Sequence, residues 1–149
     1  MSDDVTVSAD PATQAMMSYD IQLIAESPFA KSVAGKAIVR ILWEYNDNKQ
    51  ILYDETVDEA RADWDGKTIR INNTFTGKVL PTTVELVHEG SHILWRKGHR
   101  KPTDPNQALA DHLADEELAR KNQVEVYLWL RDKKKLPGDP ELEARLAKK

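Results

Sequence analysis

Residues 84–95 read VELVHEGSHILW, and this stretch carries two histidines four positions apart, His88 and His92. On a helix, positions i and i+4 project from the same face, so the two imidazoles can point at one metal ion. Glu89 follows the first histidine, where its carboxylate can reach a water held by that ion. The pattern H-E-x-x-H therefore predicts a hydrolytic zinc site with Glu89 as the catalytic base.

The residues on either side of this pattern favour a helix of about four to five turns. Thr82 and Glu85 have the spacing of a capping box, which predicts Thr82 as the N-cap, and Pro81 just ahead of it does not interrupt the helix. Gly98 follows the last apolar residues, as a glycine after a helix often does. Most of the other positions are apolar, so the helix should be largely buried, and its polar side chains need partners. The alternative to a metal is a pair of core histidines satisfied by backbone carbonyls.

A catalytic zinc site needs a third protein ligand, and the chain has no cysteine to supply a thiolate. The metzincin spacing fails, because Trp95 and Gly98 occupy the two positions where that pattern requires glycine and histidine. His99 lies just past the expected end of the helix, where an exposed loop residue is typical. The downstream candidates are His99, Asp111, His112, Glu116, Glu117 and Glu125.

A second helix is predicted from about Asn106 to Lys133, with or without a break, because Asp104-Pro105 combines an N-cap residue with proline at the first helical position. At 100° per residue, Glu116 falls near the centre of the apolar face and Glu125 on the opposite side. A carboxylate in an apolar face is costly unless it is paired or bound to metal, which favours Glu116 as the third ligand. The other members of this predicted face are Leu109, Leu113, Ala119, Gln123, Val124, Val126, Tyr127 and Leu130.

Two alternatives remain open for Glu116. Arg120 follows it by one turn on the same face, so the two could form a buried ion pair instead of a metal site. The phase of a helix is uncertain by a residue or two, which leaves Glu117 as a second candidate ligand.

The pattern His88-Glu89-x-x-His92, followed on a later helix by Glu116-x-x-Ala119, resembles the zincin metallopeptidases in their gluzincin branch. The chain is also similar, in size and in the order of its elements, to small uncharacterised bacterial zincin-like proteins. The resemblance covers about residues 68–130 and implies a zincin-like α+β fold, a zinc cofactor and peptide-bond hydrolysis. The residues after Glu116 depart from the thermolysin-like pattern, and no histidine stands where those enzymes carry their transition-state donor.

The rest of the chain predicts one α+β domain over residues 1–149, with helices packed on a small, mainly antiparallel sheet. Residues 1–11 are expected to be disordered, and 136–149 to form a loop and a short tail helix. We expect helices over 13–26 and 29–45, a strand over 50–54, and a hairpin of 60–64 and 67–72 around Asp65-Gly66. The strand over 67–73 is expected to be an edge strand beside the H-E-x-x-H helix, where an extended peptide could pair with it. The loop over 73–78 is either a border of that cleft or an ordinary connection.

The composition of the chain limits the classes of binding partner that we expect. The formal net charge is −4, and acidic and basic residues are mixed along the chain, so no basic stripe suggests nucleic acid. The run 131–135 is basic but ends a predicted helix, where cations interact favourably with the helix dipole. No apolar run is long enough to span a bilayer, and the absence of cysteine fits a reducing compartment, so we expect a cytoplasmic protein.

We therefore expect His88, His92 and Glu116 to hold zinc and Glu89 to act as general base on a peptide or protein substrate. Arg120 or His99 could assist the metal in stabilising the carbonyl oxygen. The small size of the chain favours one alternative, an inactive zincin-fold module for metal binding or protein interaction. A peptidase-type toxin or effector domain is the other.

Overall fold

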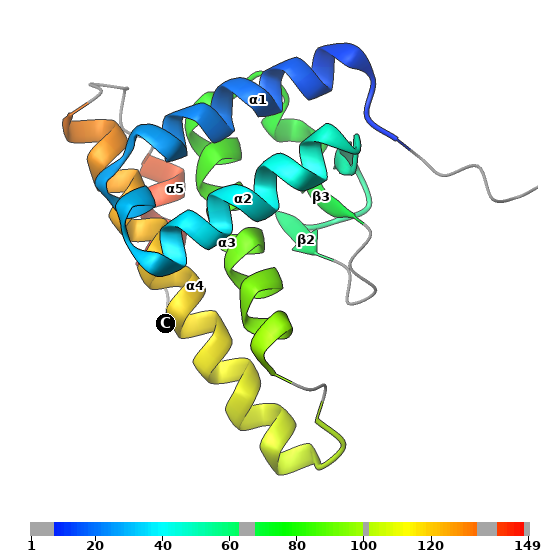
Figure 1. Ribbon diagram of the computed structural model, residues 1–149, viewed down its shortest axis with the longest axis vertical. Helices are drawn as coiled ribbons and strands as arrows, with labels where there is room; N and C mark the ends of the chain where they lie inside the picture. The colour runs from blue at the N-terminus through cyan, green and yellow to red at the C-terminus, as the bar shows by residue number, and fades with distance from the viewer. Residues whose placement is uncertain (1–7, 63–67, 100–101, 134–139, 148–149) are drawn as a thin grey trace, which may run out of the picture.

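The computed structural model describes residues 8–62, 68–99, 102–133 and 140–147, and it shows an α+β fold that is mostly helical (Figure 1). Its elements in chain order are α1 (Pro11–Glu26), η1 (Pro28–Lys31), α2 (Val33–Asp47), β1 (Ile51–Asp54), β2 (Ala60–Ala62), β3 (Ile69–Asn72), η2 (Asn73–Phe75), α3 (Val79–Gly98), α4 (Pro105–Asp132) and α5 (Pro140–Leu146).

The two N-terminal helices begin at capping residues. The Asp10 carboxylate accepts a hydrogen bond from the Thr13 amide at 2.7 Å, with Pro11 in the first helical turn. α1 therefore starts two residues before the predicted boundary and includes Pro11, which was assigned to a disordered segment. Ser32 caps α2, and the short 3-10 helix η1 separates it from α1. The helix predicted over 29–45 is thus divided between η1 and α2.

The sheet is mixed, and the prediction of a mainly antiparallel sheet is wrong. Its strand order is β1-β3-β2, with β1 parallel and β2 antiparallel to β3. β3 is the central strand, with Ile69 and Ile71 buried, so the prediction that it forms an edge is also wrong. The reason is that β2 pairs on the side of β3 opposite β1, which leaves β2 at an edge. The predicted Asp65-Gly66 turn lies outside the described residues.

Helix α3 runs through the middle of the fold and packs against α1, α2, α4 and the sheet. It begins at Val79 with Lys78 as its N-cap, so the predicted N-cap Thr82 is instead a buried residue inside the helix. Pro81 is tolerated because it lies in the first turn of the helix, where backbone N–H groups make no hydrogen bond within the helix. The helix ends at Gly98, within one residue of the predicted end.

Gly90 lies between the two histidines at the point where α2 crosses α3. A Cβ atom at this position would come within 2.9 Å of the Ile38 side chain. Ser91 follows Gly90, and its hydroxyl donates a hydrogen bond of 2.7 Å to the Val87 carbonyl, one turn earlier in the same helix. Close packing of α2 therefore explains the small residue inside the H-E-x-x-H pattern.

Helix α4 is unbroken over 28 residues and begins at the predicted N-cap, Asp104. Its C-terminal two thirds pack on the body, whereas its N-terminal turns extend past α1 and α2 together with the end of α3 (Figure 1). Leu109 and Leu113, predicted to be buried, are each 59% exposed because they belong to this projecting part. The buried side of α4 consists of Asp115, Ala119, Asn122, Gln123, Val126, Tyr127 and Leu130.

Helix α5 lies against α4 (Figure 1). Leu142 is buried in the core, and the Tyr127 hydroxyl donates a hydrogen bond to the Glu143 carboxylate. Among the described residues, none of the helices has the length and apolar character needed to cross a membrane.

Candidate metal centre

Three side chains from two helices converge on one point. His88 and His92 lie one turn apart on α3, and Glu116 reaches them from α4. One donor atom from each lies within 4.8 Å of the others. A Glu116 carboxylate oxygen is 2.8 Å from His92 Nε2, and its second oxygen is 3.5 Å from His88 Nε2. The predicted group could therefore hold a metal ion.

Each histidine is oriented by a hydrogen bond at its other ring nitrogen. His88 Nδ1 lies 2.7 Å from Gln123 Oε1, and His92 Nδ1 lies 2.8 Å from the Asp115 carboxylate. Gln123 is held in turn, because its amide donates to the Glu85 carboxylate at 3.1 Å. In the neutral tautomer with the proton on Nδ1, each ring would donate to these oxygens and offer its Nε2 lone pair to a metal ion. Histidines that bind a metal usually make such a hydrogen bond with the ring nitrogen that does not face the metal.

The donor set fits zinc. Two imidazole nitrogens and one carboxylate are a common protein contribution to a catalytic zinc site, with a position left for water or substrate. Tetrahedral bonds of ordinary length separate donor atoms by about 3.3 Å. The His88 to Glu116 separation is close to this value, and the His92 to Glu116 separation of 2.8 Å would open slightly.

The site brings several ionisable side chains together where they are partly or fully buried. Burial by itself would lower the pKa of His92, but hydrogen bonds to Asp115 and Glu116 outweigh it and raise the pKa to about 9. The pKa of His88 is raised as well, because the Glu116 carboxylate and the nearby Glu89 outweigh burial. Hydrogen bonds from His88 and His92 hold the pKa of Glu116 well below its ordinary range. The two imidazoles thus take the place of a positive ion beside the carboxylate.

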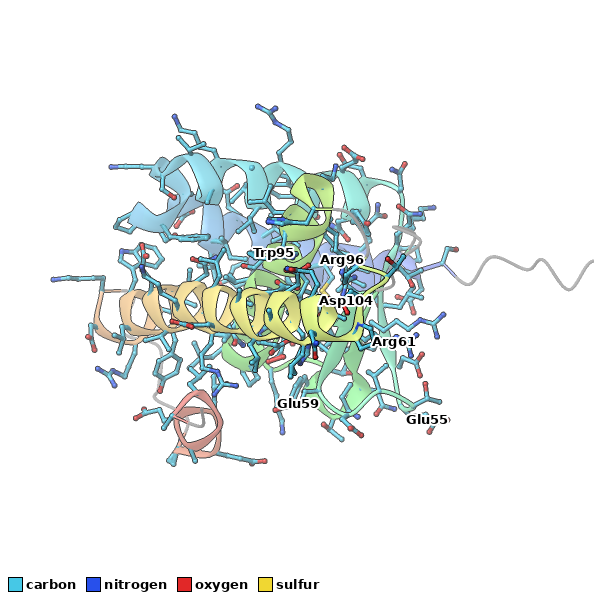
Figure 2. All side chains as sticks on the ribbon, turned by 90° about the horizontal axis from the view of Figure 1, so that it is seen from below. Glu55, Glu59, Arg61, Trp95, Arg96 and Asp104 are labelled. Carbon is cyan, nitrogen blue, oxygen red and sulfur yellow. The ribbon has the colours of Figure 1, made fainter. Side chains whose placement is uncertain are left out.

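Glu89 is beside this group but is not one of its three members. Its side chain is buried, and burial raises its pKa. It lines a cavity of about 110 Å³ together with His88, Glu116 and Arg120. Other walls come from the sheet and from α5, which lie on the same side of α4 (Figure 2). The structure therefore brings the predicted base and two predicted ligands to one cavity.

The alternative pairing of Glu116 with Arg120 is not found. The ion pairs of Glu116 are with the two histidines. Arg120 Nη1 is buried and has no hydrogen-bond partner among the described residues. His88, His92 and Glu116 form the candidate metal group. Arg120 lines the cavity at this metal group and also a second hollow, whose other lining residues are Leu113, Glu116 and Glu117. A buried guanidinium nitrogen without a partner is unusual, which makes this residue a candidate binder of an anionic group.

The other predicted candidates lie elsewhere. Glu117, Glu125 and His112 are exposed on α4, and none of them belongs to the convergent group. Asp111 accepts a hydrogen bond from the side chain of Gln107, one turn earlier. His99 is exposed and its ring stacks on Trp95, with centroids 3.8 Å apart. Trp95, labelled in Figure 2, is on the last turns of α3, beyond His92, so His99 is removed from the cavity.

Asp115 and Gln123 were missed as functional positions from the sequence. Both are polar residues on the buried side of α4, at spacings of one and seven from Glu116. Since zinc-binding histidines usually donate to a carboxylate or carbonyl oxygen, a search for buried polar residues on the Glu116 face would have found them. The helix α3 is also linked to α4 by Asn122, whose amide donates to Ser91 at 3.0 Å.

No family model, curated protein or solved structure matches this chain.

Proposed function

We propose that this protein is a zincin-like metallopeptidase that uses zinc to hydrolyse peptide bonds. The observation that carries the proposal is the convergence of His88, His92 and Glu116, with the buried carboxylate of Glu89 beside them. A structural metal site has no need of a fourth, non-ligating carboxylate in the same cavity. A cytoplasmic location belongs to the proposal, since a chain without cysteine gains nothing from an oxidising compartment.

The protein side chains have distinct tasks in this reaction. Zinc, when bound by His88, His92 and Glu116, would lower the pKa of a bound water to about 7 and polarise the substrate carbonyl. Glu89 would accept a proton from the attacking water and return it to the nitrogen of the departing amine. Its place in the wall of the same cavity as His88 and Glu116 puts the carboxylate within reach of such a water.

Arg120 is the protein residue best placed to stabilise negative charge on the substrate. It faces the cavity of Glu89 and Glu116, and its buried Nη1 has no partner in the described part of the chain. A guanidinium remains charged at any physiological pH and donates several hydrogen bonds. His99, the other candidate, does not line the cavity.

The edge of the sheet supports a peptide as the substrate. The Asn72 amide donates to the Glu59 carbonyl at 2.8 Å, so in this antiparallel pair the backbone groups of Ala60 point away from β3. Ala60 also lines the cavity at the metal group. The Ala62 carbonyl points the same way and accepts a hydrogen bond from Arg96 at 2.6 Å. An extended peptide beside β2 would meet the amide and carbonyl of Ala60 close to Glu89.

One observation favours a second candidate, a zincin-fold module that binds metal without hydrolysis. The cavity at the metal group is about 110 Å³, small for a segment of peptide, and Leu142 and Leu146 of α5 form part of its wall.

The hollow on the Leu113 side of Glu116 favours hydrolysis instead. It is larger, about 590 Å³, and would provide the space that a substrate needs.

The decisive experiment compares Glu89→Gln with the wild type in zinc content and in cleavage of broad peptide libraries. Glu89→Gln should keep its zinc and lose hydrolysis by about 10²–10⁴-fold, because it has the same shape but cannot accept a proton. Glu125→Gln is the matched control, since Glu125 is an exposed carboxylate of α4 that lines neither the cavity nor the hollow.

Chelator-sensitive cleavage at equal rates by the wild type and Glu89→Gln would refute the mechanism. A zinc-loaded wild type that cleaves nothing in these libraries would favour the module without hydrolysis.

A further inference from the structure

A further pocket lies at the N-terminal end of α3, between α1, β1 and the segment that leads into α3. Its volume is about 320 Å³. Val79 lines it, and His88 follows nine positions later, about 13 Å further along the helix. None of its lining residues lines the cavity at the metal group. The walls are formed by Ala15, Met16, Tyr19, Asp20, Tyr53, Gly77, Lys78 and Val79.

Asp20 is the acidic group of this pocket, and it is only 3% exposed. Among the described residues, no ion pair joins it to a basic side chain. Burial without a counter-ion raises the pKa of Asp20 to about 8. The side chain of Thr83 on α3 interacts with the Asp20 carboxylate and lowers its pKa, but by less than burial raises it. Asp20 is thus a buried acidic side chain with no basic partner among the described residues, an arrangement that native proteins rarely tolerate.

The other walls are suited to an organic ligand. Tyr19 and Tyr53 supply aromatic rings, and Met16 supplies a flexible apolar side chain. The Tyr53 hydroxyl is 3.1 Å from the Thr82 hydroxyl, which in turn donates to the Phe75 carbonyl, so Tyr53 is the donor and its ring is held in place. Tyrosine faces attract organic cations as well as apolar groups.

We propose that this pocket binds a small organic ammonium ion of single charge, with Asp20 as its counter-ion. An ammonium group brings a positive charge and N–H donors, which the Asp20 carboxylate in the wall of the pocket can accept. The apolar part of the ligand lies against Met16 and the two tyrosine rings. Lys78 at the rim is exposed and disfavours a second positive charge at the mouth of the pocket.

The competing explanation is a pocket filled by water alone, which would also give hydrogen-bond partners to Asp20. The two differ in selectivity. A water-filled pocket shows no preference for an amine over a neutral molecule of the same shape, whereas an ammonium site does.

The test is binding of 2-phenylethylamine to the full chain, measured by titration calorimetry, with 2-phenylethanol as the neutral isostere. The amine should bind saturably and the alcohol at least tenfold more weakly. Asp20→Asn should weaken the amine at least tenfold and leave the alcohol unchanged. Glu26→Gln removes one negative charge from an exposed position on the same helix and should change neither.

A second variant guards against a general effect of Asp20→Asn on folding. Ala15→Leu adds bulk at the wall of the pocket, at an exposed helical position, and keeps Asp20. It should weaken the amine while its melting temperature stays within a few degrees of the wild type. Equal affinity for amine and alcohol, unchanged amine binding in Asp20→Asn, or no saturable amine binding by the wild type would overturn the proposal. These results do not depend on whether the metal group is hydrolytic.

Discussion

Glu116 and Glu117 are adjacent carboxylates with opposite surroundings. Glu116 contacts both histidines, whereas Glu117 is exposed. Glu116→Gln should therefore weaken zinc binding by at least tenfold, because the amide is a poor zinc ligand, and Glu117→Gln should leave it unchanged. Zinc content after gel filtration and competition with a chromophoric chelator measure both. Loss of zinc only in Glu117→Gln would contradict the geometry of the group.

Asp20 makes stability depend on pH. Its pKa is about 8 in the fold and about 3.8 when exposed, so the folded chain binds the extra proton between these values. The contribution to stability is complete below pH 4 and is lost as the pH rises to about 8. Asp20→Asn, which is neutral throughout, should therefore be more stable than the wild type by a few kcal/mol above pH 8, since one pKa unit is about 1.4 kcal/mol.

The difference between Asp20→Asn and the wild type should shrink as the pH falls toward 4, and urea unfolding across this range measures it. The other ionisable groups at the pocket are Tyr19 of α1, Tyr53 of β1 and Lys78 before α3. Burial raises the pKa of Tyr53, so its phenol stays neutral in this window. A constant difference at every pH would show that Asp20 does not titrate as described.

Helix α4 has two parts with different energetics. Leu130 is fully buried near its end, and Leu113 is 59% exposed in the part that projects beyond the body. Leu130→Ala should lower the free energy of unfolding by about 2–5 kcal/mol, the usual cost of a buried leucine. Leu113→Ala, a matched change on the same helix, should alter it by no more than about 0.5 kcal/mol. Similar losses in both variants would mean that Leu113 is covered in solution.

At the scale of the whole molecule, the metal group joins α3 to α4, the most extensive helix contact of the fold. An ion bound only by the folded chain stabilises it by mass action, by about 2.7 kcal/mol at a hundredfold excess over the dissociation constant. Zinc should therefore raise the melting temperature of the wild type by several degrees, and a chelator should reverse the rise. His92→Ala should show no such response, and an equal rise in that variant would place the bound zinc elsewhere.

The local pattern of the chain was sufficient to place most of the helices and the histidine pair, but it put the start of α3 at Thr82 and missed the break between η1 and α2. The i,i+4 spacing of His88 and His92 depends only on helix geometry, and the N-cap at Asp104 depends only on the residues next to it. Glu116 was also found from periodicity, because a carboxylate on an otherwise buried face is rarely without a purpose.

The tertiary structure alone decided what depends on contacts between distant segments. β3 became the central strand because β2 and β1 pair with its two sides, and sequence alternation does not specify neighbours. Leu109 and Leu113 were predicted to lie on the apolar side of α4, yet each is 59% exposed, since α3 and α4 extend past the other helices. Asp115, Gln123 and Asp20 gained their roles from partners 23 or more residues away or from burial under other elements, which no local pattern records.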